Sequence, residues 1–113
     1  DEMSSRGLGD VYKRQVETSQ IFTSLPLYMG YTAYSLNHNP SKVNEIIDNL
    51  TSHSLDFSNG VYQRYFSTMI LSNLKMLLEA RNEIGLTSTV RDAINEIKSK
   101  EKDPMLLGWY SQM

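Results

Sequence analysis

The longest helical stretch of this chain, and the one that decides its fold, is Val61–Gly85, VYQRYFSTMILSNLKMLLEARNEIG. Apolar side chains recur over most of its circumference, namely Tyr65, Phe66, Met69, Ile70, Leu71, Leu74, Met76, Leu77 and Leu78. A helix with this pattern is buried on several sides. The sequence therefore predicts a central helix from about Val61 to Ile84, ended by Gly85 as a left-handed C-cap.

A shorter helix is predicted on the N-terminal side of this stretch, from about Leu25 to Leu36. Ser24 is suited to cap it, and Pro26 falls in the first turn, where its missing N–H costs little. The turn-forming residues Asn37–Asn39 are expected to end it.

Two further helices carry the same four-position apolar stripe. One is predicted from Asn39-Pro40 to about Ser52, and the other from about Val90 to Lys100 after a cap within Thr87–Thr89. The stripe has the spacing i, i+3, i+4, i+7. It consists of Val43, Ile46, Ile47 and Leu50 in the first helix and of Val90, Ala93, Ile94 and Ile97 in the second.

Strand patterns are nearly absent, so the predicted fold class is all-α. We expect two consecutive αα-hairpins, one at about 24–53 and one at about 60–100, with the possible start of a third at 104–113. Asp103-Pro104 is a good helix start, and Met105, Leu106, Leu107 and Trp109 after it are expected to be buried.

The two hairpins resemble each other. When the chain is shifted by 47 residues, Ser24–His53 lies on Leu71–Lys100 with seven identities in thirty positions. A period near 47 and short turns resemble the architecture of HEAT-type and tetratricopeptide-type helical repeats, without the signature of any specific family. The resemblance implies a solenoid-like stack. Two other interpretations stay open: chance similarity of amphipathic helices, and a compact four-helix bundle without a repeat.

The N-terminal residues 1–15, DEMSSRGLGDVYKRQ, resemble a translated sequencing adapter. Ser5–Gln15 back-translate with ordinary codons to the end of a transposase-based adapter. Such a segment is excluded from fold reasoning. We therefore expect residues 16–113 to form a single helical domain that is a fragment of a longer protein, and localisation stays open.

Composition restricts the partners that we expect. The chain has 13 acidic and 11 basic residues and a net charge of −2, and residues 1–15 contribute three of each sign. No basic stripe is present, which argues against nucleic-acid binding. The sequence contains no cysteine, which excludes disulfides and thiolate metal sites in this piece. Thr18–Ser41 lacks charged residues but is too polar, with Pro26 and Gly30, to be a membrane span.

Four titratable residues are candidates for chemical sites. His38 and His53 lie fifteen residues apart, which gives no metal-ligand spacing, so they are expected to be a solvated turn residue and a histidine at a helix C-terminus. Glu79 and Glu83 form an i, i+4 pair near Lys75, as expected for surface charges. The sequence thus predicts no catalytic residue, no metal site and no cofactor.

Tyrosines are the candidate binding residues. Tyr28, Tyr31 and Tyr34 recur every third residue in the first helix, and Tyr62 and Arg64 open the central one. An aromatic ring with a hydroxyl suits a partner interface, and it equally suits packing between hairpins. Both roles stay open at this point.

The leading functional hypothesis is a non-catalytic helical-repeat scaffold segment that mediates protein or peptide interaction, with neighbouring repeats of the full-length chain as further contacts. The alternative is a fragment of a helical, α/α-toroid-like enzyme that acts on carbohydrate. Such enzymes are also built from helical hairpins and line their clefts with aromatic residues and carboxylates.

Overall fold

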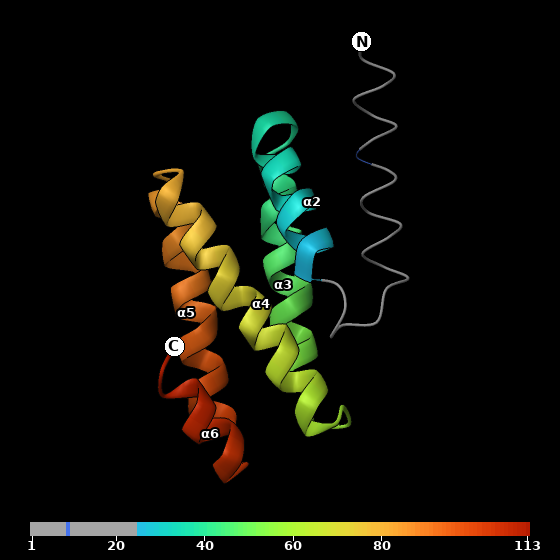
Figure 1. Ribbon diagram of the computed structural model, residues 1–113, viewed down its shortest axis with the longest axis vertical. Helices are drawn as coiled ribbons and strands as arrows, with labels where there is room; N and C mark the ends of the chain where they lie inside the picture. The colour runs from blue at the N-terminus through green and yellow to red at the C-terminus, as the bar shows by residue number, and fades with distance from the viewer. Residues whose placement is uncertain (1–8, 10–24) are drawn as a thin grey trace.

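The computed structural model describes Gly9 and residues 25–113. Apart from Gly9, the adapter-like segment lies outside the described residues, as does the predicted cap Ser24. Five helices follow one another in residues 25–113 (Figure 1): α2 (Leu25–His38), α3 (Ser41–Leu55), α4 (Val61–Ala80), α5 (Ile84–Lys100) and α6 (Pro104–Tyr110). No strand occurs in this range, which confirms the all-α fold class.

Helix α4 is the element around which the others pack. It contacts α3, α5 and α2, and α3 also contacts α5 and α2. Figure 1 shows α4 crossing between α5 on one side and α3 on the other, with α6 beside the C-terminal half of α5. Within the described residues, no helix is long and apolar enough to cross a membrane.

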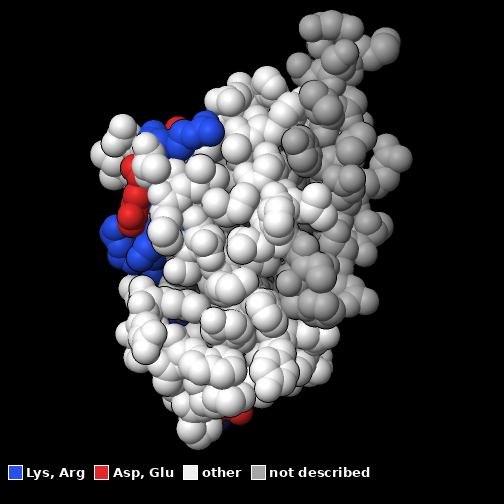
Figure 2. Space-filling view, viewed as in Figure 1, with Lys and Arg blue, Asp and Glu red and all other residues white. Residues whose placement is uncertain are grey.

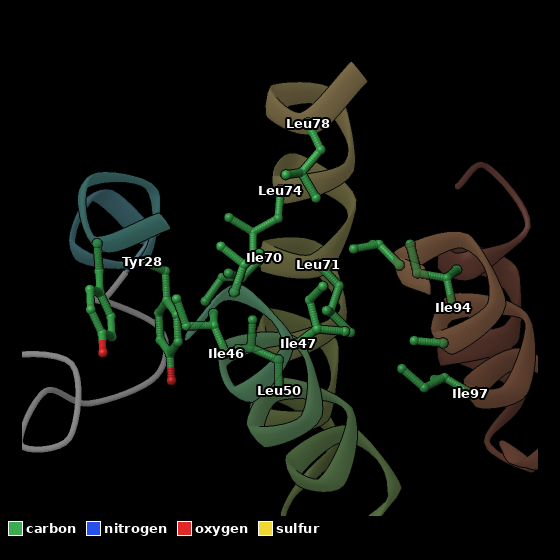
Figure 3. Packing of buried hydrophobic residues seen from close by; sticks show 14 of the residues in the cluster. Tyr28, Ile46, Ile47, Leu50, Ile70, Leu71, Leu74, Leu78, Ile94 and Ile97 are labelled. Atoms are coloured by element: carbon green, nitrogen blue, oxygen red, sulfur yellow. The ribbon is translucent and has the colours of Figure 1, made fainter. Parts of the chain in front are cut away.

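The hydrophobic core is built from the stripes that the sequence predicts. The two four-residue stripes of α3 and α5 are at most 9% exposed and form one hydrophobic cluster with residues of α4. Figure 3 shows Ile47 and Leu50 of α3 and Ile94 and Ile97 of α5 in this cluster. From α4 itself, the fully buried apolar residues are Ile70, Leu71, Leu74 and Leu78. Burial of this size drives association of the helices, since each fully buried aliphatic side chain contributes about 1.5–3 kcal/mol.

The N-terminus of α4 is fixed by a local hydrogen bond. Gly60 precedes the helix in an extended conformation, and its N–H donates to the Gln63 Oε1 at 3.1 Å. This is the side-chain half of a capping box, in which the third helical residue reaches back to the cap. The helix therefore begins at Val61, as predicted.

The C-terminus of α4 differs from the prediction. The helix ends at Ala80 and not at Ile84, and the left-handed residue is Asn82, with φ of 59°, and not Gly85. The Asn82 N–H donates to the Glu79 carbonyl at 3.1 Å and the Glu83 N–H to the Leu78 carbonyl at 2.9 Å. These two bonds form a Schellman motif, and asparagine is the residue other than glycine that most readily occupies its left-handed position.

Because α4 ends early, α5 begins early as well. Its first residue is Ile84, so Gly85 and the predicted cap Thr87–Thr89 lie inside the helix. The cap prediction for α3 is also wrong in detail. Asn39 does not cap the helix: its Oδ1 accepts from the Ser41 hydroxyl at 2.7 Å, and α3 begins after Pro40.

Helix α6 starts where the sequence predicts. The Asp103 carboxylate accepts from the backbone N–H groups of Met105 at 2.9 Å and Leu106 at 3.1 Å, and Pro104 follows it as the first helical residue. Of the four apolar side chains expected to be buried, only Leu106 is. The other three are partly exposed, Met105 at 44%, Leu107 at 38% and Trp109 at 37%.

Truncation of Leu74 should show that α4 is central to stability. Leu74→Ala removes a fully buried side chain and should lower the free energy of unfolding by about 2–5 kcal/mol. On the same helix Met76 is 62% exposed, and Met76→Ala is the matched control, expected within about 0.5 kcal/mol of the unmodified chain. Urea unfolding followed by circular dichroism measures both. Equal losses for the two variants would contradict the central position of α4.

Candidate functional site

The largest network of hydrogen-bonded side chains among the described residues lies at the N-terminal end of α4, where α6 packs against it. It has a buried polar part and an exposed aromatic part. In the buried part, Arg64 on α4 donates from Nε to Glu101 Oε1 at 3.1 Å and from an Nη to Glu101 Oε2 at 3.2 Å. Their side chains are 9% and 2% exposed. This is a bidentate pair, the strongest geometry available to these two side chains.

Both side chains of this pair make further contacts with their surroundings. The other Arg64 Nη donates to the Asn59 carbonyl at 2.5 Å, and the Arg64 guanidinium lies 5.4 Å from the ring centre of Phe57. Glu101 Oε2 accepts from the backbone N–H groups of Lys102 at 3.0 Å and Asp103 at 3.1 Å. A buried charge pair is stable only when such bonds satisfy its lone pairs and protons.

The pKa of Glu101 depends on two opposing effects, burial of the carboxyl and the hydrogen bonds that it accepts. Burial alone would raise the pKa of the carboxyl, but the hydrogen bond from Arg64 and those from Asp103 and Lys102 outweigh burial and hold it below its usual value. Glu101 is therefore a carboxylate in the folded protein and not a proton donor.

Four hydroxyl groups continue the network from Arg64 into the interface of α3, α4 and α6. Tyr110 on α6 is fully buried, and its hydroxyl donates to the Arg64 carbonyl at 3.1 Å. Thr68 Oγ1 lies 2.9 Å from Ser54 Oγ, and Ser54 Oγ lies 2.5 Å from Ser67 Oγ. Ser67 in turn donates to the Arg64 carbonyl at 3.0 Å.

One arrangement of protons satisfies every hydroxyl of this network. If Thr68 donates to Ser54, Ser54 to Ser67, and Ser67 and Tyr110 to the Arg64 carbonyl, each O–H has one acceptor. Burial raises the pKa of Tyr110, which keeps its hydroxyl protonated. A network in which all groups are paired fixes a unique packing and leaves no free group for a substrate.

The outer part of the site consists of three rings, which we call the aromatic patch: the exposed Tyr62 and Trp109 and the half-buried Tyr65. The Trp109 ring lies edge-on to Tyr65 with 4.7 Å between centroids, and its centroid lies 6.4 Å from that of Tyr62. Tyr62 is 66% exposed and Trp109 37% exposed. Tyrosine and tryptophan in this setting are the residues most enriched at the centre of protein interfaces.

The aromatic patch continues into a stripe along α4, which we call the outer face of α4: Tyr62, Phe66, Met69, Asn73, Met76 and Ala80. These residues are exposed or half-buried, and they carry no charge. Figure 2, drawn from the same side as Figure 1, shows that Lys, Arg, Asp and Glu gather at the edges of the described surface. The middle, where α4 crosses, is free of them. Such uncharged surfaces mark interaction sites.

The five predicted binding residues differ in burial and in their contacts. Tyr28 and Tyr31 are each 8% exposed and belong to the hydrophobic core (Figure 3 labels Tyr28), and burial raises the pKa of Tyr28. Tyr34 is half-buried with its ring edge-on to His38 at 4.2 Å. Arg64 is engaged in the buried network. Of the five, Tyr62 alone lies mostly exposed.

Two of the titratable residues that the sequence singled out, Glu79 and Glu83, line one surface pocket at the turn between α4 and α5, together with Arg91. His38 ends α2 and is exposed, while Glu79 is exposed at the end of α4 and Glu83 is half-buried just before α5. In the part of the chain that the structure describes, no three His, Cys, Asp or Glu side chains gather as metal ligands would.

His53 differs from the expectation of a simple C-terminal histidine. It is half-buried in the last turn of α3, and burial lowers its pKa below the ordinary value of 6.5, against a smaller opposite effect of Asp56. Its Nδ1 is buried and meets no hydrogen-bond partner among the described residues. Protonation of the ring would therefore place an unpaired charge in a partly apolar site.

Comparison of the chain with protein-family models, with curated proteins and with solved structures gives no match. The class of the protein is therefore defined by its own structure, an all-α chain of packed helical hairpins. Its function has to be argued from its surfaces and sites, since a fold alone does not imply a function.

Removal of the Glu101 charge should destabilise the fold through Arg64. Glu101→Gln keeps the shape but leaves the buried guanidinium without a counter-charge, and we expect a loss of about 3 kcal/mol in the free energy of unfolding. The matched control is Glu96→Gln, which breaks an exposed i, i+4 pair with Lys100 and should cost at most about 0.5 kcal/mol. Denaturant titrations of both variants test this, and a loss at Glu101 as small as at Glu96 would contradict it.

His53 should make stability depend on pH. Because its folded pKa lies below 6.5, the unfolded chain binds more protons than the folded one as the pH falls through 6.5, and the free energy of unfolding decreases. His53→Gln should flatten this part of the profile, whereas His38→Gln at the exposed end of α2 should leave it in place. Thermal unfolding midpoints across neutral and mildly acidic pH measure the slope, and an unchanged slope in the His53 variant would refute the assignment.

Proposed function

We propose that this chain is a non-catalytic helical module, of the stacked-hairpin type, that binds a protein or peptide partner. The observation that carries the proposal is the outer face of α4 with its aromatic patch. The residues of this surface are exposed or half-buried and uncharged, and tyrosine, tryptophan and methionine are frequent among them. Methionine adapts to partners of varied shape, and aromatic rings supply large contact area at low entropic cost.

The contacts between helices support the stacked arrangement. The first helices of the two hairpins, α2 and α4, contact each other, and so do the second helices, α3 and α5. When αα-hairpins stack side by side, the first helix of one hairpin contacts the first helix of the next, and the second helices do the same. The equivalent stripes of α3 and α5 are both buried by this arrangement. A stack presents the surface of its hairpins as an extended platform for partners.

The polar groups beside the aromatic patch support a binding role and not a catalytic one. The side chains of Arg64 and Glu101 form hydrogen bonds with each other and with backbone groups. A carbohydrate-active enzyme needs two carboxylates that are free to act on the bond between sugars. The α/α-toroid alternative therefore stays a prediction from the sequence, while the binding role has a defined surface.

The outer face of α4 determines which partners would fit. A helix of 20 residues is about 30 Å long. An amphipathic helix of a partner could lie along it with residues at i, i+3, i+4 and i+7 as anchors. A partner with charges at these anchors would bury them without a counter-charge, which is costly.

Selection from a random-peptide display library tests the proposal. Peptides selected on this protein should carry apolar residues at helical spacing, and they should lose at least tenfold in affinity when Met76→Glu places a charge on the outer face of α4. The matched control Asn95→Glu places the same charge on the exposed surface of α5 and should leave affinity unchanged. If no selected peptide is sensitive to Met76→Glu, or all lose affinity equally with both variants, the outer face is not the binding surface.

A further inference from the structure

We propose that the pocket at the turn between α4 and α5 binds one arginine or lysine residue with a free carboxylate, either as the amino acid itself or at the C-terminus of a peptide. The pocket has a volume of about 400 Å³, which lies in the range of small-molecule sites. Its polar lining includes Glu79, Glu83, Thr87, Ser88 and Arg91. The pocket shares no residue with the outer face of α4, so the inference does not depend on the proposed function.

The turn between the two helices creates this pocket. Because Asn82 takes the left-handed conformation, with φ of 59°, α4 ends at Ala80 and α5 begins at Ile84. Glu79 before the turn and Glu83 after it thereby line the same pocket as the first two turns of α5. Figure 2 shows acidic and basic side chains close together at the upper left edge of the molecule, where Figure 1 places this turn.

The charged side chains of the pocket are unpaired within the described part of the chain. Glu79 and Glu83 form no ion pair or side-chain hydrogen bond there, and Arg91 forms none either. Two carboxylates that line one pocket repel each other, and a positive group between them removes this repulsion. Since Arg91 is not paired with either of them, the pocket offers a negative end and a positive end to a ligand.

The first turns of α5 separate these two ends. Glu83, Thr87 and Arg91 follow one another at intervals of four residues, so they lie along one side of the helix. The eight residues from Glu83 to Arg91 correspond to about 12 Å along the helix axis. A ligand that reaches both ends therefore carries its positive group well away from its carboxylate. The long side chain of arginine or lysine separates the two charges in this way.

Thr87 gives an independent indication of a ligand. It lines the pocket between the two charged ends, it is only 5% exposed, and its Oγ1 meets no hydrogen-bond partner among the described residues. Buried polar groups are nearly always paired in folded proteins, so an unpaired one requires an explanation. Threonine in a helix has two accessible rotamers, and rotation turns the hydroxyl toward the pocket without moving the helix. There it can donate to the carboxylate of the ligand, beside Arg91.

The lining fits other classes of ligand less well. A phosphate would gain Arg91 but would be repelled by the two carboxylates. A metal ion would find only these two carboxylates, because no third His, Cys, Asp or Glu among the described residues joins them. None of the residues that line the pocket is aromatic, so a sugar has no ring on which to stack. Two acids and one base in one pocket match a ligand with charges of both signs.

Titration of the isotope-labelled full chain with N-acetyl-L-arginine, followed by NMR at low ionic strength, tests the site. We expect saturable shifts of the amide signals of residues 79–91, with a dissociation constant on the order of 1 mM for so small a ligand in an open pocket. N-acetyl-L-argininamide lacks the carboxylate and N-acetyl-L-norleucine lacks the positive group, so each should bind about fivefold more weakly. Absence of saturable shifts, or equal binding of all three compounds, overturns the proposal.

Two charge variants locate the ends of the ligand. Glu83→Gln should weaken the binding of N-acetyl-L-arginine about fivefold, and Arg91→Gln should do the same. Arg91→Gln should leave the binding of the argininamide unchanged, because that compound has no carboxylate. The matched controls are Asp92→Asn and Arg81→Gln, which change exposed neighbours outside the pocket and should alter the affinity less than about twofold. An equal effect of Arg91→Gln on both compounds contradicts the assigned orientation.

Thr87→Val separates a binding role of the hydroxyl from a structural one. The variant replaces a buried hydroxyl without a partner by a methyl group of similar size, so the thermal unfolding midpoint should stay the same or rise. The affinity for N-acetyl-L-arginine should fall about threefold, as for the loss of one hydrogen bond. A lower midpoint together with unchanged affinity would show that the hydroxyl serves the fold and would refute its role in binding.

The source of the ligand is tested with free L-arginine and with an N-acetylated tripeptide that ends in arginine with a free carboxylate. Tighter binding of the tripeptide assigns the pocket to a peptide C-terminus, and tighter binding of free arginine assigns it to the amino acid. Both results support the proposal, whereas binding of both compounds no tighter than that of the argininamide overturns it. Met76→Glu on the outer face of α4 should leave all these affinities unchanged, so the pocket and the proposed function are tested separately.

Discussion

The burial of α4 is the constraint on which the rest of the structure depends. Leu71, Leu74 and Leu78 are fully buried because α3 and α5, which also contact each other, both pack against α4 and carry the same four-position stripe. A single helix with an apolar circumference is not stable alone in water, and most of the apolar surface of α4 is buried against these neighbours. The position of α2 and α6 follows from this arrangement. Both contribute to the packing around α4, and the residues of the outer face stay exposed or half-buried.

The buried pair of Arg64 and Glu101 fixes how the N-terminal end of α4 packs against the C-terminal end of α5. An apolar interface tolerates small shifts of one helix along another, whereas a bidentate ion pair with satisfied hydrogen bonds accepts one arrangement. This pair joins the first turn of α4 to the residue that ends α5, and Tyr110 joins α6 to the same turn through the Arg64 carbonyl. The rings of the aromatic patch come from α4 and α6. Their spacing is therefore set by polar groups that lie directly beneath them.

Periodicity in the sequence predicted the class of fold and the core, and it did so for a physical reason. A helical stripe such as Val43 to Leu50 predicts which residues are buried, because the apolar face of a helix packs against the core. The end of α4 was predicted wrongly because Gly85 is the stronger local indication of a left-handed cap, while Asn82 takes that conformation in the structure. The partner of Arg64 could not be predicted at all. Glu101 is 37 residues away, and only the packed hairpins bring the two side chains together.

The shift by 47 residues gives a last argument about the uncovered surface. It places Met29 on Met76 and Ala33 on Ala80, two identities that belong to the first helices of the two hairpins. On α2, Met29 packs against the core, whereas on α4 the equivalent Met76 is 62% exposed. If the repeat is genuine, equivalent positions should have equivalent surroundings, and the exposed one lacks its cover. A hairpin stack leaves such a face at each end.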